Sequence, residues 1–361
     1  MPSQSLRNGR PQTPKFFAFL SLLMVIASLL LALNGCSARN NDNASVVMAK
    51  QLPGTLAPLG TPNPSAQRVT VGLYVINVYD ISLSSQTYYL TGYMWMRWQG
   101  ENDPTGSLEF TNTVDEWGLL RKNLYEKPLV LGDGSYYQAT RIQGRFFQPF
   151  DLTNYPLDKQ KLILLIENSA NADKVVFLPD TDASGYDQNL MAPGWNITSL
   201  QMEPLLHDYG TSFGNPADPG TYSALRFSLD LTRVQNLFVW KLMLPLVIVL
   251  FTNWLALTLS PTRIDVRTAM PATALLTTVF LQQASLDAIP QVASLVLMDK
   301  IYAVAYGVLV LTFARIVWDN THIKEEDVQA VRQMHRMDLI SLALQVVGFV
   351  LVTSVMVWSV L

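Results

Sequence analysis

The sequence is poor in cysteine, histidine and charge. Cys36 is the one cysteine among 361 residues, which excludes an intrachain disulfide and a cysteine-based zinc site. The three histidines are scattered and match no HExxH-type spacing for a metal. Charged residues make up 15% of the chain and the formal net charge is -3, so there is no polybasic signature for nucleic acid. We therefore expect no metal site, no cofactor and no nucleic-acid partner.

Catalytic motifs are also missing. The chain has no Ser/His/Asp order, no metal cluster and no Gly-rich phosphate loop, so we do not expect an enzyme. Apolar residues, in contrast, make up 49% of the chain. They concentrate near the N-terminus and after Leu237, while the middle has the pattern of a soluble β domain. This distribution is typical of a membrane protein with a soluble domain.

Residues 1–36 have the pattern of a secretory signal segment. Three basic residues precede an apolar run from Phe16 to Leu33, and the segment ends at Cys36. This ending resembles a bacterial lipobox, in which the cysteine is acylated. Ordinary signal cleavage and a retained anchor helix are the alternatives.

The rest of the chain divides into three parts. Residues 37–67 are rich in Asn, Ser, Pro and Gly without periodicity, which predicts a flexible linker. Residues 68–236 contain many short β-branched or alternating runs separated by turn residues, which predicts an antiparallel β-sandwich. Residues 237–361 contain four apolar segments near the ~20 residues needed to cross a bilayer. These expected helices cover about 237–259, 265–288, 301–318 and 339–361.

Basic residues predict the orientation of these helices. Arg263 and Arg267 lie between the first two helices, and Lys324, Arg332 and Arg336 lie between the last two. Both loops fall on one side if the helices alternate, and that side should be cytoplasmic. The β domain then lies outside, in agreement with a signal segment.

The second helix is unusually polar for a membrane span. It carries an acid at each end, five threonines or serines, and a glutamine pair. A helix that faces only lipid would not hold these groups, because an unpaired polar group in hydrocarbon costs several kcal/mol. Helical spacing gathers seven residues on one stripe: Asp265, Ala269, Thr273, Leu276, Phe280, Gln283 and Asp287. This helix is therefore the candidate wall of a pore.

The stripe has the chemistry of a cation path. Asp265 and Asp287 would form carboxylate rings at the two mouths, which favours cations, and Leu276 and Phe280 would form apolar rings that can dewet. The alternative is that the two acids only cap helix ends, because an acid at a helix start suits the helix dipole. Arg267 complicates the selectivity, since a base two residues from Asp265 can neutralise it unless its side chain points away. Pro271 can kink the helix or delay its start.

The β-sandwich, the four helices and one loop together resemble the pentameric ligand-gated ion channel family. The loop at residues 150–160, FDLTNYPLDKQ, resembles the family's signature loop, with Gln148 and Leu162 in place of its two cysteines. Bacterial members of the family also lack these two cysteines. Arg233 stands where the family has an arginine before the first membrane helix, and Leu244-Pro245-Leu246 also fits. The resemblance covers roughly residues 68–361.

The resemblance implies a cyclic homopentamer in which five copies of the second helix line the pore, with Leu276 in its central leucine ring. It also implies that Asp80, Asp158 and Arg233 couple the β domain to the helices, and that they act on the linker that begins at Pro290. A static structural salt bridge is the alternative for these charges.

The resemblance further implies a ligand site between neighbouring subunits. Tyr209 and Phe213 lie in the hairpin before the last strand, Glu167 lies in an expected ligand loop, and Trp95 is available for the complementary wall. Aromatic rings with one carboxylate would favour an amine, although such aromatics are also common in a sandwich core.

The predicted function is thus a ligand-gated, cation-selective channel in the bacterial inner membrane. Its β domain would lie on the periplasmic side and bind a small-molecule or proton agonist. Its other partners would be membrane lipid and permeant monovalent cations. A non-conducting receptor or sensor on the same fold is the alternative.

Overall fold

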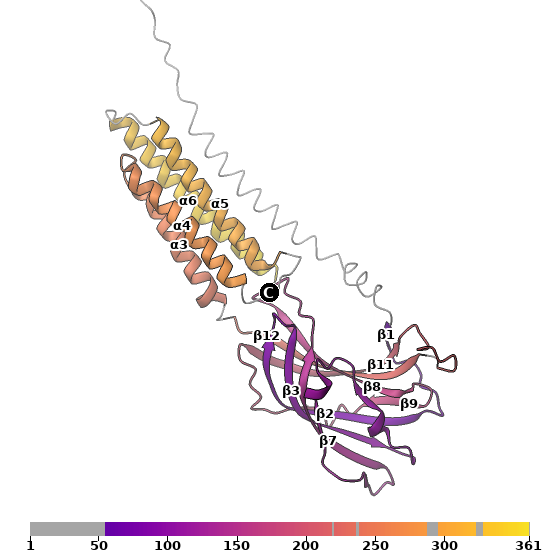
Figure 1. The fold of residues 1–361 in the computed structure, drawn as a ribbon. Coiled ribbons are helices and arrows are strands. Elements are labelled where there is room, and N and C mark those ends of the chain that lie inside the picture. Colours follow the sequence, from indigo (N-terminus) through magenta and orange to yellow (C-terminus); the bar gives the residue numbers. More distant parts are fainter. Residues whose placement is uncertain (1–54, 219, 236–237, 287–294, 323–327, 361) are drawn as a thin grey trace, which may run out of the picture.

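The computed structural model describes residues 55–218, 220–235, 238–286, 295–322 and 328–360. These residues form a β domain followed by four long helices, as Figure 1 shows. The predicted signal segment, including Cys36, lies outside the described residues, and so do Asp287 and Pro290.

The first sheet of the β domain has five strands in the order β1-β11-β12-β8-β4. All its neighbouring strands pair antiparallel. In chain order the strands are β1 (Thr55–Pro58), β4 (Leu108–Phe110), β8 (Lys159–Asn171), β11 (Trp195–Asp208) and β12 (Thr221–Arg233).

The second sheet has seven strands along the path β10-β2-β3-β7-β5, with β6 paired to β7 and β9 paired to β2. Only the short strands β9 and β10 pair parallel. The strands are β2 (Gln67–Ser82), β3 (Thr87–Trp98), β5 (Leu120–Asn123), β6 (Leu129–Val130), β7 (Tyr136–Phe147), β9 (Val175–Pro179) and β10 (Gly185–Tyr186). Two short 3-10 helices, η2 (Pro104–Ser107) and η3 (Glu116–Gly118), lie in the connections.

Side-chain alternation explains how the two sheets make one core. In β3, Met94, Met96 and Trp98 are buried, while Arg97 on the opposite face is exposed. Strand residues point alternately to the two faces, so one face of each sheet can be apolar and close against the other. The prediction of a β-sandwich is confirmed.

The helical part begins with a π-helical turn, η4 (Phe238–Met243), that continues into α3 (Leu244–Thr258). It is followed by α4 (Ile264–Leu286), α5 (Leu297–His322) and α6 (Val328–Trp358). The segment Phe238–Thr258 and the three later helices are each long and apolar enough to cross a membrane. This is the arrangement expected of a multi-pass membrane protein.

The last two helices are longer than their apolar segments predict. The apolar runs indicated helices over 301–318 and 339–361, whereas α5 begins at Leu297 and α6 begins at Val328. Hydropathy detects only the part of a helix that is apolar. Polar turns such as those around Gln333 are helical but carry no such signal.

The stretch expected to be a flexible linker differs in its described part. Thr55–Pro58 forms strand β1, which pairs with β11 from Asp208 to Leu205. All four of its residues are exposed, so main-chain pairing with the edge of the first sheet holds it rather than an apolar face. Composition could not reveal this pairing, because the strand buries no side chain.

One apolar core runs from the sandwich into the helices. Buried residues of the sheets, of the loop at 150–157 and of α3, α4, α5 and α6 belong to a single contact cluster. Val296, Leu297 and Met298 at the start of α5 are among them, each at most 3% exposed. The signature loop is therefore packed into the boundary between the two parts.

Candidate functional site: the domain junction, the polar helix and an aromatic cluster

The domain junction contains a buried ion pair between Asp158 and Arg233, two residues to which the resemblance assigns a coupling role. The Arg233 guanidinium donates from Nε to Asp158 Oδ1 at 2.6 Å and from Nη2 to Oδ2 at 3.0 Å. The side chains are 9% and 1% exposed for the arginine and the aspartate. Gln160 donates a third hydrogen bond to Asp158 Oδ2 at 2.6 Å. This two-point geometry fixes the end of β12 against the signature loop.

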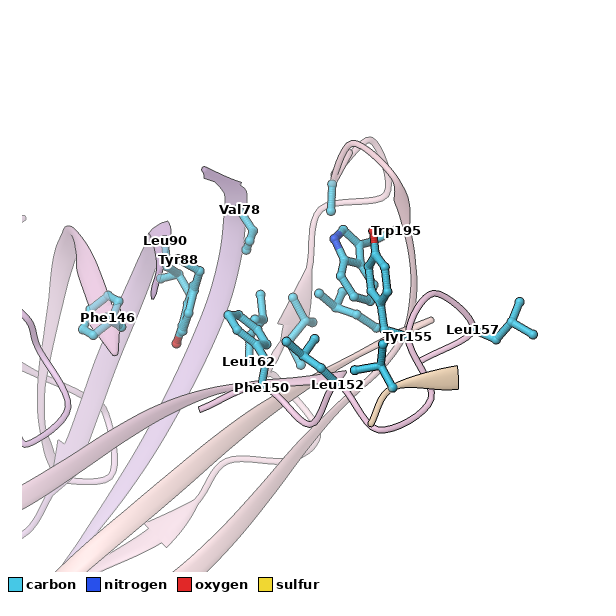
Figure 2. Close-up of a cluster of buried hydrophobic side chains, with 14 of the residues drawn as sticks. Val78, Tyr88, Leu90, Phe146, Phe150, Leu152, Tyr155, Leu157, Leu162 and Trp195 are labelled. Atoms are coloured by element: carbon cyan, nitrogen blue, oxygen red, sulfur yellow. The ribbon is translucent and has the colours of Figure 1, made fainter. Parts of the chain in front are cut away.

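Two aromatic rings complete the surroundings of Arg233. Its guanidinium lies 4.0 Å from the ring centroid of Trp195 and 5.1 Å from that of Tyr155. Tyr155 and Trp195 lie next to one another in Figure 2, and Phe150 and Leu152 belong to the same buried cluster. Cation–π contacts of this kind strengthen when the site is desolvated. Trp195 and Tyr155 were not predicted as site residues, because each is distant from Arg233 in the chain.

The signature loop also bonds directly to the helices. The backbone N–H of Leu297, the first residue of α5, donates to the Thr153 carbonyl at 3.1 Å. Asp299 Oδ2 accepts from the Val296 N–H at 3.2 Å, and its Oδ1 lies 3.5 Å from Gln282 Nε2 of α4. A connected path therefore leads from the β domain to the polar helix.

Asp80 does not pair with Arg233. Its carboxylate, on β2, forms an ion pair with Arg145 of β7, across the intervening strand β3. Asp80 has a positive φ of 52°, a conformation that aspartate tolerates better than most residues. The grouping of Asp80 with Asp158 and Arg233 is thus not seen in the described residues, and Pro290 lies outside them.

The polar helix α4 has one buried face and one exposed face. Arg267, Pro271, Ala274, Thr278 and Ser285 are buried against the other helices. Steps of four, three, four and seven residues separate them, which is the repeat of one helix side. The described members of the predicted stripe are all exposed on the opposite side: Asp265, Ala269, Thr273, Leu276, Phe280 and Gln283.

Several exposed stripe residues line a groove beside α3. The groove has a volume of about 580 Å³ and is lined by Asp265, Ala269 and Thr273 of α4 together with Val249 and Thr252 of α3. Leu276 and Phe280, further along, are 56% and 65% exposed. A large apolar side chain at such exposure in one subunit is available to a neighbouring subunit, to lipid or to a pore.

The structure places Arg267 and Pro271, whose effects on the inner mouth the sequence left open. The Arg267 side chain lies inside the helix bundle, on the side of α4 opposite Asp265, and is 1% exposed. Pro271 is buried within α4, which begins seven residues earlier at Ile264, so the proline does not delay the helix start. The inner end of the stripe is therefore helical, with Asp265 in the first turn.

Three of the four predicted ligand residues lie together around the β11–β12 hairpin. Glu167 of β8 is 3% exposed, and its Oε2 accepts from the Tyr209 hydroxyl at 3.1 Å. The rings of Tyr209 and Phe213 meet edge to face with centroids 5.2 Å apart. A buried carboxylate thus lies beside an aromatic cluster.

Two further residues join this cluster that the sequence analysis did not select. His207 Nδ1 lies 2.9 Å from Glu167 Oε2, and its ring stacks on Tyr209 at 3.9 Å. Tyr222 of β12 has its ring centroid 5.8 Å from that of Tyr209. The register pairs His207 with Tyr222 across the two strands. Once the β11–β12 hairpin is recognised, its strand register identifies both His207 and Tyr222 as neighbours of Tyr209.

The phenol groups of Tyr209 and Tyr222 lose their protons only at a higher pH than an ordinary tyrosine does. The pKa of Tyr209 is raised, first by burial and then by the nearby Glu167 carboxylate. The pKa of Tyr222 is raised to about 12, chiefly because its hydroxyl donates to Asp218 Oδ2 at 2.8 Å. Both phenols therefore remain hydrogen-bond donors over the physiological range.

Trp95 belongs to the other sheet, away from the aromatic cluster of its own subunit. Its indole N–H donates to Asp180 Oδ2 at 2.9 Å. The ring crosses Gly72, where a Cβ would lie 2.2 Å from ring atoms, so a side chain there would displace it. A cavity of about 470 Å³ lies beside Trp95, with Arg97 and Tyr137 in its lining. Within the described residues, Trp95 and the cluster thus lie on different sheets.

Comparison with known proteins finds relatives with channel and receptor names, and no protein-family model matches the chain. A proton-gated ion channel of Gloeobacter violaceus is 24% identical over 52% of this chain and 55% of its own length. A pH-sensitive chloride channel 2 of Drosophila melanogaster is 23% identical over 52% of this chain and 38% of its own. A γ-aminobutyric acid receptor subunit beta of Lymnaea stagnalis is 24% identical over 50% of this chain and 35% of its own.

These matches span about half of this chain and between a third and about half of each relative. None of the three names is that of an enzyme. The sandwich, the four helices and the packed signature loop are the features on which the resemblance was based. In sequence and in fold, the chain is similar to the pentameric ligand-gated ion channels, as its signature loop and polar helix predicted.

Proposed function

We propose that this chain is the subunit of a homopentameric, ligand-gated, cation-selective ion channel. The observation that carries the proposal is the two-sided character of α4. Its buried side packs on the bundle, and its opposite side exposes an acid, a threonine and a glutamine along one stripe. Five such stripes around one axis would give an aqueous path. The names of the relatives support an ion-conducting role.

Cation selectivity follows from the charge at the inner end of the stripe. Asp265 is exposed in the first turn of α4, and five copies would form a carboxylate ring. Arg267, the base that would oppose it, is buried on the other side of the helix. One relative is a chloride channel by name, so this charge arrangement, rather than family membership, supports the selectivity.

The agonist site proposed here is the cluster around Glu167. A small amine fits the aromatic rings and the carboxylate. Protons are the second agonist within the same proposal, because two relatives are proton-gated or pH-sensitive by name and because His207 contacts Glu167 at 2.9 Å. Imidazole is the side chain that gains charge near neutral pH, and a protonated His207 would form a charge-assisted bond to the carboxylate.

The junction supplies the mechanical connection in this proposal. The cluster and the junction share strands, since β11 and β12 lead from His207 and Tyr222 to Trp195 and Arg233. The Asp158–Arg233 pair and the Thr153–Leu297 hydrogen bond then join those strands to α5. A shift of the hairpin would be transmitted through contacts that are already formed. Membrane lipid would surround the helices, with the β domain on the outer side of a bacterial inner membrane.

The conducting role is tested by recording currents from the purified chain in planar bilayers under a salt gradient. We expect currents whose reversal potential favours Na⁺ over Cl⁻. Asp265→Asn should lower the permeability ratio of Na⁺ to Cl⁻ by about threefold or more, the effect of removing a unit charge within roughly 7 Å of the ion path in water. Asp115→Asn, an equal change of charge at an exposed β-domain position without a capping bond, is the matched control.

Each outcome of this recording has a clear meaning. A bilayer that stays silent while the protein binds a ligand would favour the non-conducting receptor. Currents that are equally selective after Asp265→Asn would contradict the role of the acidic ring.

Proton gating is tested by changing the pH on the β-domain side. His207→Gln should abolish or shift the current response to acid, because glutamine keeps a hydrogen bond to Glu167 but cannot gain charge. The groups that face His207 are Glu167, Tyr209 and Tyr222, with Glu109 paired opposite Glu167 on β4. His322→Gln in α5 is the control histidine. An unchanged acid response in His207→Gln would rule out this proton site and leave the amine.

A further inference from the structure

Four charged side chains meet inside the helix bundle, in the half distant from the β domain. Arg267 comes from α4, Arg315 and Asp319 from α5, and Asp338 from α6. Their side chains are 0% to 7% exposed. From the sequence, Arg267 indicated orientation and a possible opponent of Asp265, whereas Arg315, Asp319 and Asp338 were not predicted as site residues. We name these four residues the buried charge network.

The network is closed, since each aspartate contacts both arginines. Arg267 Nη2 lies 2.8 Å from Asp338 Oδ2 and 3.3 Å from Asp319 Oδ2. Arg315 reaches the other oxygens, at 3.0 Å from Asp338 Oδ1 and 3.0 Å from Asp319 Oδ1. Arg267 Nε also donates to the Ala256 carbonyl of α3 at 3.1 Å. Groups from the other three helices therefore hold the Arg267 guanidinium.

The formal charges of the network cancel, with two guanidinium groups against two carboxylates. Within α4 this leaves Asp265, which is exposed on the opposite side of the helix. Arg267 follows Asp265 by two residues, and a flexible arginine side chain is long enough to swing its charge toward the helix start. Five arginines released in this way would offset five acids.

We propose that Asp319 and Asp338 are selectivity-determining positioning residues of the channel. They hold Arg267 inside the bundle, so that the carboxylate ring of Asp265 acts on ions without an opposing ring. This proposal rests on the proposed cation-channel function. Arg263, which is exposed in the turn before α4, is present in every variant below and therefore does not affect the comparison.

The experiment measures the permeability ratio of Na⁺ to Cl⁻ from reversal potentials in planar bilayers. Asp338→Asn removes the carboxylate with the shortest contact to Arg267, and we expect the ratio to fall by about threefold or more as the freed charge approaches the ion path. The double variant Arg267→Gln with Asp338→Asn has no charge to release and leaves the network neutral. Its ratio should return to that of the wild type, which a merely structural defect would not produce.

Two results would overturn the proposal while leaving the cation channel intact. One is an Asp338→Asn channel with wild-type selectivity. The other is a double variant whose ratio rises about threefold or more above that of the wild type, because Arg267 would then already have opposed Asp265. A silent wild-type bilayer would instead overturn the channel function, and the proposal with it.

If Asp338→Asn does not assemble, Asp319→Asn replaces it, since that carboxylate has the longer contact of 3.3 Å to Arg267. The double variant remains a test in its own right, because its neutral network does not leave a buried cation short of a partner. Wild-type selectivity in the double variant supports the proposal, and a raised ratio contradicts it.

Discussion

The Arg233 side chain contacts several parts of the domain junction at once. It is held by two hydrogen bonds to Asp158, lies over the rings of Trp195 and Tyr155, and ends the last strand before the helices. Removing one partner of such a pair leaves the other charge buried, which is far more destabilising than losing an exposed pair.

Asp158→Asn should therefore lower the free energy of unfolding of the β domain by about 3–5 kcal/mol. The measurement is chemical unfolding of the detergent-solubilised protein, followed by tryptophan fluorescence. Glu203→Gln is the matched control, because its partner Arg226 lies at a similar 3.1 Å but the two side chains are 52% and 28% exposed. That control should cost less than about 1 kcal/mol. Equal losses of unfolding free energy in the two variants would show that the buried Asp158–Arg233 pair stabilises the fold no more than an exposed pair does.

The Tyr222 phenol should make the stability of the β domain depend on pH in the alkaline range. The pKa of this phenol is raised to about 12 in the folded protein, whereas the unfolded chain releases the proton near its ordinary value of 10.0. Above that value the folded state binds more protons than the unfolded state, so the stability of the β domain should fall as pH rises from about 10 to about 12. Asp218→Asn should lower this pKa, because the acceptor carboxylate loses its charge.

Tyrosine absorbance during an alkaline titration measures this effect. Tyr222→Phe should remove one late-titrating group from the wild-type curve. A variant curve that keeps every late-titrating group of the wild type would show that the hydroxyl of Tyr222 is not held by Asp218.

At the scale of elements, the two sides of α4 differ in what packs against them. Its buried residues repeat at helical spacing and its polar stripe lies opposite, so the helix has two sides with different requirements. The serine and threonine hydroxyls of the helix are partly satisfied by backbone carbonyls one turn earlier, as Thr273 donates to Ala269 and Thr277 to Thr273. Such bonds let a polar helix exist in an apolar layer.

Cysteine replacement along α4 tests which side meets water. In a Cys36→Ser background, cysteines at Thr273 and Leu276 should react with a charged thiol reagent in the membrane-embedded channel. Cysteines at the buried positions Ala274 and Thr278 should not, because they pack against the other helices. Reaction at 274 or 278 but not at 273 would place the aqueous path on the other side of the helix. Mass spectrometry of the labelled protein gives the readout.

The whole molecule is one packed unit in which a core continues from the sandwich to the helices. This continuity means that the signature loop cannot move without disturbing the start of α5, where Val296 and Leu297 are buried. In the proposed pentamer, neighbouring copies of the same chain would complete the exposed stripe of α4 and the cavity beside Trp95.

Native mass spectrometry of the detergent-solubilised protein should accordingly detect an assembly of five subunits. The expectation follows from the proposed function, because a stripe on one helix forms a closed aqueous path only when several copies surround an axis. A stable monomer under conditions that retain the fold would contradict it. Circular dichroism of the same sample is the control for the fold.

Much of the architecture and part of the site were predictable because they depend on local pattern. The alternation in β3 indicates a strand with one buried face, and the long apolar runs indicate membrane-spanning helices. Asp158 was selected from a loop motif, and Arg233 from its position just before the first helix. The chain length of α6 and the strand β1 were not predictable, since polar helical turns and an exposed edge strand have no hydrophobic signal.

What the sequence by itself determined is where each environment begins and which side of each element is apolar, because these depend on residues a few positions apart. Only the tertiary structure decided which distant groups meet. It buried Arg267 among Asp319 and Asp338, gave Glu167 a histidine partner, and paired Asp80 with Arg145 instead of Arg233. The physical reason is that a buried charge or hydrogen-bond donor is stable only beside a partner, and the fold rather than the spacing along the chain supplies that partner.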